Sequence, residues 1–312
     1  MEISILLAEQ ILAMFLTMAV GFGVVRAGLF KTEDSRIISN MVVYICNPCV
    51  VVHSFQIELT DDKIKGLMIA IGLSVVVHMV LIIGSEILSF IFHFNSIEKA
   101  SIIYTNAGYL VIPLVGAVLG EEWVFYTTAF ILVQTVLMWT HGVKLIGQEK
   151  ELNIRKILCN PNVIAMIIGI ALFALEIRLP TVVDSCVSGF GDMISPASMM
   201  VIGMVIGDVD LKWVFHQKRP YLICLLRLIV FPLIAVVAFA GLERSGIHPD
   251  AEYILMIVLI ATSAPAAAMI TQLAQIYGKD SRYASVINVV SVIFCIITMP
   301  VMVLSYEMLI AL

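Results

Sequence analysis

Two stretches decide the fold of this chain: ASIIYTNAGYLVIPLVGAVL at residues 100–119 and YILMIVLIATSAPAAAMITQLAQIY at residues 253–277. Each is long and apolar enough to cross a bilayer, and each has an interior proline, Pro113 in the first and Pro265 in the second. A proline inside a helix removes one backbone donor and clashes with the preceding turn. In lipid, the carbonyl that it frees must bond within the protein or line a cavity. The sequence therefore predicts two membrane helices that are broken at their prolines.

The composition indicates that lipid surrounds most of the chain. Of the 312 residues, 61% are hydrophobic and 13% are charged, and the mean hydropathy is +1.05. A soluble domain has roughly 45–50% apolar and about 25% charged residues. The formal net charge is −5 without a basic run, so nucleic acid is not an expected partner.

Apolar windows of about 20 residues, the length that spans the hydrocarbon core, recur along the chain. Their hydrophobicity is continuous rather than alternating, which excludes barrel strands. The ten expected spans are 6–25, 37–55, 64–92, 100–119, 124–146, 162–177, 187–206, 221–242, 253–277 and 283–309.

The loops between these spans alternate in charge. One set holds most of the basic residues: Arg26, Lys31, Arg36, Lys99, Lys144, Lys150, Arg155, Lys156, Lys212, Lys218, Arg219, Lys279 and Arg282. The other set holds many acids: Glu58, Asp61, Asp62, Glu121, Glu122, Glu243, Asp250 and Glu252. By the positive-inside rule the basic set faces the cytoplasm, and we expect both termini on the outside.

The longest polar loop divides the spans into two groups of five. Because five is odd, two related halves would have opposite orientations in the membrane. Pro48 and Pro196 lie at similar distances before Pro113 and Pro265, which supports such a relation. We predict an all-α polytopic membrane protein made of two inverted five-helix repeats. The predicted parts are a first repeat at 1–146, a cytoplasmic linker at 147–161 and a second repeat at 162–312.

Several short motifs follow one another along the spans. They are Asn106-Ala-Gly-Tyr-Leu-Val-Ile-Pro113-Leu114 with Gly120, Val133-Gln134, Asn160-Pro161 with Gly169, Ser195-Pro196 with Gly203, Arg227 with Pro232, and Ala264-Pro265 with Gly278. Each motif is weak alone, but their order and spacing resemble the auxin efflux carrier family, also called the membrane transport protein family. The resemblance covers almost the whole chain.

The resemblance implies ten helices, of which the fourth and ninth cross at their prolines. Helices three to five and eight to ten would form a mobile transport domain. Helices one, two, six and seven would form a scaffold, through which a homodimer could assemble. The family moves small organic anions, from auxin to dicarboxylates such as malate and malonate, and alternating access is the implied mechanism. A long central hydrophilic loop is missing, which favours a prokaryotic relative in the plasma (inner) membrane.

The residue types near the two breaks suit an anion site. Paired broken segments in two halves are a pointer to the binding site of a transporter, and a half-helix that begins there directs free N–H groups at its ligand. Amide and hydroxyl side chains can add hydrogen bonds, although simple bonding between helices is the alternative reading. The candidate substrate-binding residues are Asn47, Asn106, Pro113, Gln134, Ser263, Pro265 and Asn288.

Two charges lie inside spans, Glu86 in the third and Arg227 in the eighth. An intramembrane charge is a functional candidate by default, and opposite charges at similar depth can neutralise each other. We predict that Glu86 and Arg227 form a structural pair. Direct contact of Arg227 with substrate is the alternative.

No metal, cofactor or catalytic machinery is expected. The Cys46-Asn-Pro-Cys49 motif lies in an apolar span without the strand and helix of a redox site. His53, His78 and His141 lack the spacing of metal ligands. The chain also has no nucleophile elbow, phosphate loop or paired catalytic acids, which disfavours an enzyme.

Two other functions stay open. A sodium-coupled symporter of the bile-acid type would share the crossed helices, but it would need acidic or amide ligands beside the crossing, and acids near either proline occur only in the loop pair Glu121 and Glu122. A membrane receptor or sensor would need a soluble signalling domain, which none of the loops is long enough to hold.

Overall fold

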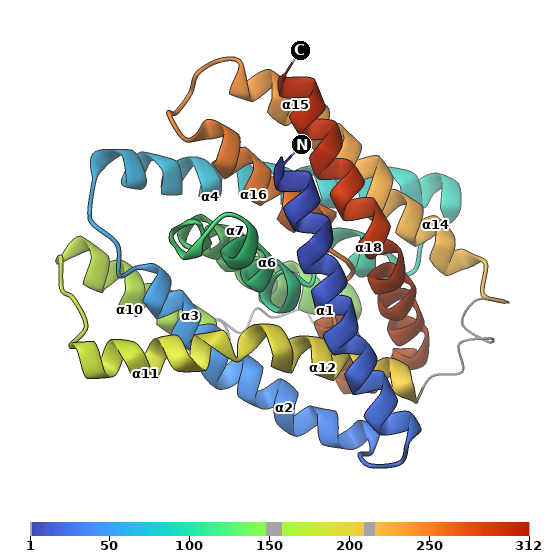
Figure 1. The fold of residues 1–312 in the computed structure, drawn as a ribbon. Coiled ribbons are helices and arrows are strands. Elements are labelled where there is room, and N and C mark those ends of the chain that lie inside the picture. The colour runs from blue at the N-terminus through green and yellow to red at the C-terminus, as the bar shows by residue number, and fades with distance from the viewer. Residues whose placement is uncertain (1, 148–157, 209–215, 312) are drawn as a thin grey trace.

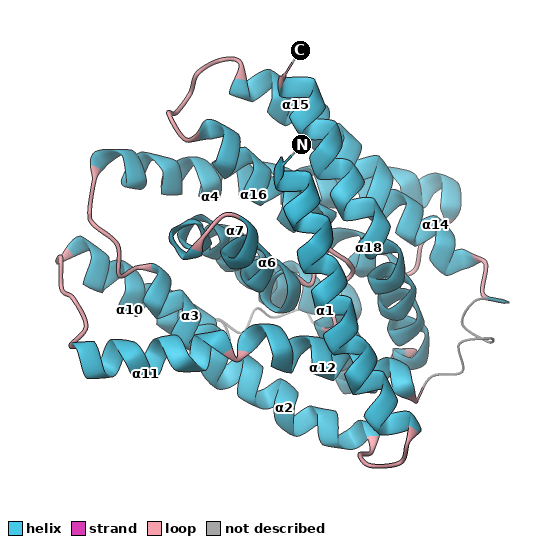
Figure 2. Ribbon diagram, viewed as in Figure 1, coloured by secondary structure: helices cyan, strands magenta, loops and turns pink. Residues whose placement is uncertain are grey.

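The computed structural model describes residues 2–147, 158–208 and 216–311. These residues form helices joined by loops, with no strand among them (Figure 2). Most of the predicted linker at 147–161 lies outside the described residues, as do the first and last residues of the chain.

The first half contains helices that begin and end as follows: α1 (Glu2–Arg26), η1 (Thr32–Asp34), α2 (Ser35–Met41), η2 (Val42–Cys46), α3 (Asn47–Ser54), α4 (Asp61–Phe92), α5 (Ser96–Ile103), η3 (Ala107–Val111), α6 (Ile112–Val118), η4 (Glu121–Trp123), α7 (Val124–Leu137), η5 (Met138–Gly142) and α8 (Val143–Gly147). The second half contains α10 (Pro161–Ala174), α11 (Thr181–Asp192), α12 (Ile194–Gly207), α14 (Arg219–Leu225), η6 (Leu226–Val230), α15 (Phe231–Glu243), α16 (Ala251–Ser263), α17 (Met269–Ile276) and α18 (Ser281–Ile310).

Seven helical stretches of the described chain are long and apolar enough to cross a membrane. They are Glu9–Arg26, Thr32–Ser54, Asp61–Phe92, Glu121–Gly147, Thr181–Gly207, Arg219–Glu243 and Ser281–Ile310. Three shorter apolar helices, Ala107–Val118, Pro161–Ala174 and Ala251–Ser263, lie where the fourth, sixth and ninth spans are predicted. The chain is therefore an all-helical membrane protein, and the total of ten spans stays a prediction.

The helices form two groups, which pack against each other where α1 contacts α18 and α6. In the first group, α1 packs along α12, and α3 packs against α10 and α11. In the second group, α4 packs against α7 and α16, while α15 packs against α16 and α18. Figure 1 shows α1 lying across α12, and α6 and α7 lying between α4 and the layer of α11 and α12.

The contact between α1 and α12 brings the two backbones together. A Cβ atom added to Gly21 would collide with the carbonyl oxygen of Met200, and one added to Gly203 would collide with that of Met18. Small residues at such crossings are how membrane helices approach closely. Gly21 and Gly203 therefore fix the geometry of the first group.

Replacing Gly21 with alanine should destabilise the protein by about 3 kcal/mol, the upper end of the usual cost of overpacking. The added methyl group meets backbone atoms, which cannot turn away as a flexible side chain would. Thermal unfolding in detergent measures the change. Gly23→Ala is the matched control on the same helix, since a Cβ there meets nothing within 4 Å. Equal unfolding temperatures for the two variants would contradict the close crossing.

The centre of the second group is α16. Its residues from Ile254 to Ser263 are all buried, and a helix that is apolar on every side belongs in a protein interior. At the end predicted to face the cytoplasm, Glu98 links helices of this group to one another. Its side chain is buried, with 2% exposed. Its carboxylate accepts hydrogen bonds from Arg219 Nε at 2.7 Å and from the Tyr283 hydroxyl at 2.8 Å. These bonds connect α5, α14 and α18.

Candidate functional site at a helix crossing

Two helical segments of the second group are interrupted, and their interruptions meet. Helix α5 ends before residues 104–106 and the chain continues as η3 and α6, while α16 ends before residues 264–268 and continues as α17. Thr105 and Ala266 form an isolated antiparallel bridge at the meeting point. The N–H of Asn106 donates to Pro265 O at 2.8 Å, and the N–H of Ala267 donates to Tyr104 O at 3.0 Å. The residues between the helices thus provide hydrogen-bond partners for each other's backbone N–H and carbonyl groups in the interior of the protein.

The interruption at Pro265 lies where the sequence predicts it. Proline lacks an N–H group and disfavours a helical conformation of the preceding residue. Ala264 is accordingly extended, with φ −68° and ψ 155°, and α16 ends at Ser263.

The first interruption does not lie at Pro113, and that prediction is wrong. Pro113 lies in the first turn of α6, which follows the π-helical turn η3 without a gap. The carbonyl that a proline frees belongs to the residue four positions earlier, here Tyr109. The Ser198 hydroxyl on α12 lies 3.0 Å from Tyr109 O and also contacts Ile194 O on its own helix, so its one hydrogen is shared between these carbonyls. Because the freed carbonyl has a partner, the helix tolerates Pro113.

Side chains from the predicted fifth and tenth spans complete the hydrogen bonding of the bridge. Gln134 on α7 accepts from the N–H of Thr105 at 2.8 Å and donates to its carbonyl at 2.9 Å. On the other side, Asn288 Nδ2 on α18 donates to Ala266 O at 2.6 Å, and Ser291 Oγ accepts from the N–H of Ala266 at 3.0 Å. Gln134 and Asn288 therefore hold the crossing in place, which matches the alternative of bonding within the protein that the sequence left open for them.

Arg227, on η6, lies beneath the crossing and is fully buried. Its Nε donates to Ala264 O at 3.2 Å, and its Nη1 donates to Ile102 O at 3.1 Å. These carbonyls belong to the last turn of α5 and to the residue after α16, where unpaired carbonyls and the negative end of each helix dipole gather. One cation thus joins the C-terminal ends of both interrupted helices.

Arg227 does not pair with Glu86, and that prediction is wrong. Glu86 accepts from Lys99 Nζ at 2.7 Å instead. Among the described residues, no carboxylate forms a salt bridge with Arg227, and its Nη2 has no hydrogen-bond partner. The site therefore holds a buried positive charge that no acid in the described part of the chain neutralises.

Three further polar atoms beside the interruptions have no partner among the described residues. They are Asn106 Nδ2, Thr105 Oγ1 and Ser263 Oγ. Asn106 is 4% exposed and Ser263 is fully buried, so neither side chain can rely on open solvent. Buried donors without partners are costly, and they are what a polar ligand would satisfy.

Asn47 approaches the same region from the first group. Its Nδ2 would lie 3.1 Å from a Cβ added to Gly108 in η3, and its Oδ1 has no hydrogen-bond partner in the described part of the chain. Asn47, Asn106, Ser263 and Pro265 are thus predicted site residues that the structure places at or next to the crossing.

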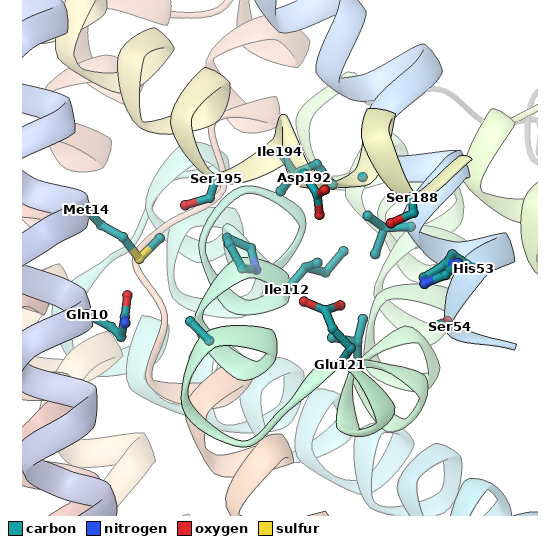
Figure 3. Close-up of a pocket in the computed structure, with 15 residues that line it drawn as sticks. Gln10, Met14, His53, Ser54, Ile112, Glu121, Ser188, Asp192, Ile194 and Ser195 are labelled. Carbon is teal, nitrogen blue, oxygen red and sulfur yellow. The ribbon is translucent and has the colours of Figure 1, made fainter. Parts of the chain in front are cut away.

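A cavity of about 280 Å³ lies between the two groups of helices (Figure 3). Pro113 lines it from α6, and Figure 3 shows Glu121 and Asp192 with their carboxylates turned toward it. His53 also lines it and bonds to Asp184, with 2.9 Å between Nδ1 and Oδ1. Sequence reasoning missed this cavity, since its walls come from helices far apart in the chain.

A second, apolar cavity of about 20 Å³ touches Pro265. Met14 lines both cavities, and Met18, Met199 and Leu110 complete much of the apolar wall beside the crossing. This volume is too small for an organic anion, so side chains of α1 and α12 cover the crossing in this conformation.

Comparison with known families agrees with this architecture. The sequence pattern of the membrane transport protein family matches residues 6–154 and 149–303, which together cover nearly all of the chain. No curated protein matches it. The family consists of membrane transporters rather than enzymes, in accord with the apolar helices described above. The chain therefore belongs to the membrane transport protein family, the family of the auxin efflux carriers.

Proposed function

We propose that this transporter carries small organic anions, such as monocarboxylates of the auxin type or dicarboxylates of the malate and malonate type, by alternating access. The observation that supports this most is Arg227, a buried cation at the crossing without an acidic partner among the described residues. Burying an unpaired charge is expensive, so it persists where another charge can balance it. An anion at the crossing would do so.

The neighbouring groups suit a carboxylate. Asn106 Nδ2 and Ser263 Oγ, on the two interrupted segments, are donors with no partner within residues 2–147, 158–208 and 216–311. Beyond each interruption a helix begins, η3 with α6 on one side and α17 on the other, and helix N-termini attract anions. The proposed site therefore combines hydrogen-bond donors from both segments with the long-range field of Arg227.

The two groups of helices give the proposal its mechanism. We assign the first group as the scaffold and the second group as the moving domain. Contacts between them include Ser198 Oγ donating to Tyr109 O and Ser39 Oγ bonding to the Tyr109 hydroxyl at 2.8 Å. These few polar contacts at η3 would break and re-form as the domain moves. The cavity beside Pro113 would be the entry path from the outer side, and Met14 the side chain that closes it.

The matching roles of α7 and α18 support the proposal of inverted repeats. Each presents amide side chains to the backbone of one interruption, Gln134 to Thr105 and Asn288 to Ala266. Corresponding helices of two related halves would behave in this way.

Purified protein in proteoliposomes should exchange external radiolabelled malonate, malate or indole-3-acetate for the same internal anion. Asn106→Ala should raise the half-saturation concentration roughly 10-fold to 100-fold, because a hydrogen bond to a charged group contributes about 1.5–3 kcal/mol. The maximal rate should change less, since the crossing itself stays bonded. Asn40→Ala, at an exposed position on α2, is the control. No exchange above empty liposomes for any of the anions would refute the function.

A further inference from the structure

The side of the crossing that faces the first group of helices is covered by apolar side chains. The small cavity that touches Pro265 is lined by Met14 and Met18 of α1, Met199 of α12 and Leu110 of η3. All four residues are buried, with at most 7% of their surface exposed. We call these four residues the methionine wall. The first group thus meets Pro265 with hydrocarbon and thioether groups.

The methionine wall lies next to the groups that are proposed to hold the anion. Cys295 of α18 lines the same small cavity, and its Sγ lies 3.6 Å from Ser263 O. Within the wall itself, the N–H of Leu110 donates to Asn106 O at 3.2 Å. Ser263 and Asn106 carry the hydroxyl and the amide that have no partner among the described residues. An anion whose carboxylate reaches these donors would therefore have the wall beside the rest of its body.

The charges around the crossing suit one carboxylate. Arg227 is buried at the crossing, and no Lys or Arg of the described chain lines either of the two cavities beside it. The larger cavity is lined instead by Glu121 and Asp192, whose carboxylates turn toward it (Figure 3), and by His53, which is bonded to Asp184. A second carboxylate on the substrate would meet either the apolar wall, where an unpaired charge is costly, or two charges of its own sign.

Movement of one side chain of the wall would join the two cavities. Met14 lines both the cavity of about 280 Å³ and the apolar one of about 20 Å³. A methionine side chain is unbranched and has three rotatable bonds, so it can turn away without a change in the backbone. The joined space would be close to the roughly 300 Å³ at which pockets for small molecules begin. It would thus have room for a carboxylate with an apolar body of several carbons.

We propose that the methionine wall determines substrate specificity: it packs against the apolar body of a monocarboxylate and excludes dicarboxylates. The proposal rests on the proposed function and chooses between the anions named there. The donors of Asn106 and Ser263 hold the carboxylate in the field of Arg227, and the body lies against Met14 and Met199. Because thioether side chains are polarizable and flexible, the wall selects for apolar surface rather than for one outline.

The first test measures equilibrium binding to the whole purified protein in detergent. Radiolabelled indole-3-acetate and radiolabelled malonate are the bound probes, and unlabelled acetate, propionate, butyrate and pentanoate displace them. Each added methylene should tighten binding about 4-fold, which corresponds to the burial of one CH₂ group. Malonate, succinate and glutarate should each bind about 10-fold or more weakly than the monocarboxylate with the same number of carbons, because their second charge has no cation to meet.

The second test removes part of the wall. In Met14→Ala, the preference for pentanoate over acetate should fall about 5-fold or more from its parent value of roughly 60-fold, because the body loses the surface that it packs against. Met68→Ala is the matched control, since Met68 is a methionine on α4 that is 63% exposed, and it should keep the preference of the parent. A ratio of two dissociation constants measured on one variant does not depend on the fraction of that variant that is folded.

The outcomes separate this inference from the proposed function. Affinity that does not rise with chain length, dicarboxylates that bind as tightly as the matching monocarboxylates, or equal preferences in Met14→Ala and Met68→Ala would overturn the methionine wall as the determinant of specificity and leave anion transport standing. Failure of the parent protein to bind or exchange any of these anions would overturn the proposed function itself, and this inference with it.

Discussion

Arg227→Gln should lose most anion transport while the protein stays folded. Glutamine is neutral but still carries N–H groups that can donate to Ile102 O or Ala264 O, which Arg227 bonds in the parent. The variant therefore removes the charge and keeps part of the hydrogen bonding. Loss of one member of a desolvated charge pair costs about 2–5 kcal/mol, which corresponds to roughly 30-fold to several thousandfold weaker anion binding. Exchange of labelled anion in proteoliposomes measures this loss.

Two further variants separate charge from structure. Arg227→Lys keeps the cation but cannot bond both carbonyls with a planar fork, so it should keep more transport than Arg227→Gln and lose more thermal stability than a surface change. Glu86→Gln removes the partner of Lys99 in a partly exposed pair and should leave both transport and stability nearly unchanged. If Arg227→Gln transports as well as Arg227→Lys, the buried charge does not attract the anion.

The sequence alone was sufficient to predict features that depend on a single residue and not on its neighbours in the fold. Pro265 ends α16 because proline lacks a donor and constrains its predecessor, whatever surrounds it. Arg227 stood out as a functional candidate because a charge inside an apolar span needs a reason, but the partner predicted for it, Glu86, was wrong.

The first interruption could not be located, because nothing within it forces a break. Tyr104 is extended, and the backbone groups of Thr105 and Asn106 leave the helical pattern because they bond to Gln134 and Pro265, which are distant in the sequence. The one local signal was Gln134 itself, a lone amide in an apolar span that must find a partner. The sequence indicates that Gln134 bonds to some polar group, but it does not show which one.

The predicted pairing of Glu86 with Arg227 failed because helix α4 is longer than the membrane core is thick. Helix α4 has 32 residues, and at about 1.5 Å per residue it is roughly 48 Å long, well beyond the hydrocarbon thickness of about 30 Å. Glu86 therefore lies toward the end of a helix that outruns the membrane core, where Lys99 can reach it. Placing Glu86 at a depth similar to that of Arg227, from its position in the predicted span, put it too deep.

Gln134→Ala should be among the most destabilising single changes to the crossing. It leaves both the N–H and the carbonyl of Thr105 without their side-chain partner, at the interruption between α5 and η3. Each unsatisfied buried group costs about 1–3 kcal/mol, so the expected loss in the free energy of unfolding is roughly 2–6 kcal/mol. Ordinary hydrogen bonds between membrane helices average only about 0.6 kcal/mol, because the separated helices find other partners. The interrupted backbone at Thr105 has less opportunity to do so.

The prediction is tested by unfolding in mixed micelles with increasing denaturing detergent. Gln134→Glu should fall between the parent and Gln134→Ala, because a carboxylate still accepts from the Thr105 N–H but no longer donates to its carbonyl. Asn288→Ala should cost less than Gln134→Ala, since Ser291 continues to bond the N–H of Ala266. Gln275→Ala, at an exposed site on α17, is the control and should unfold like the parent. If Gln134→Ala also does so, the backbone bonds between the two interrupted segments are sufficient to hold the crossing, and the side chains from α7 and α18 serve the substrate instead.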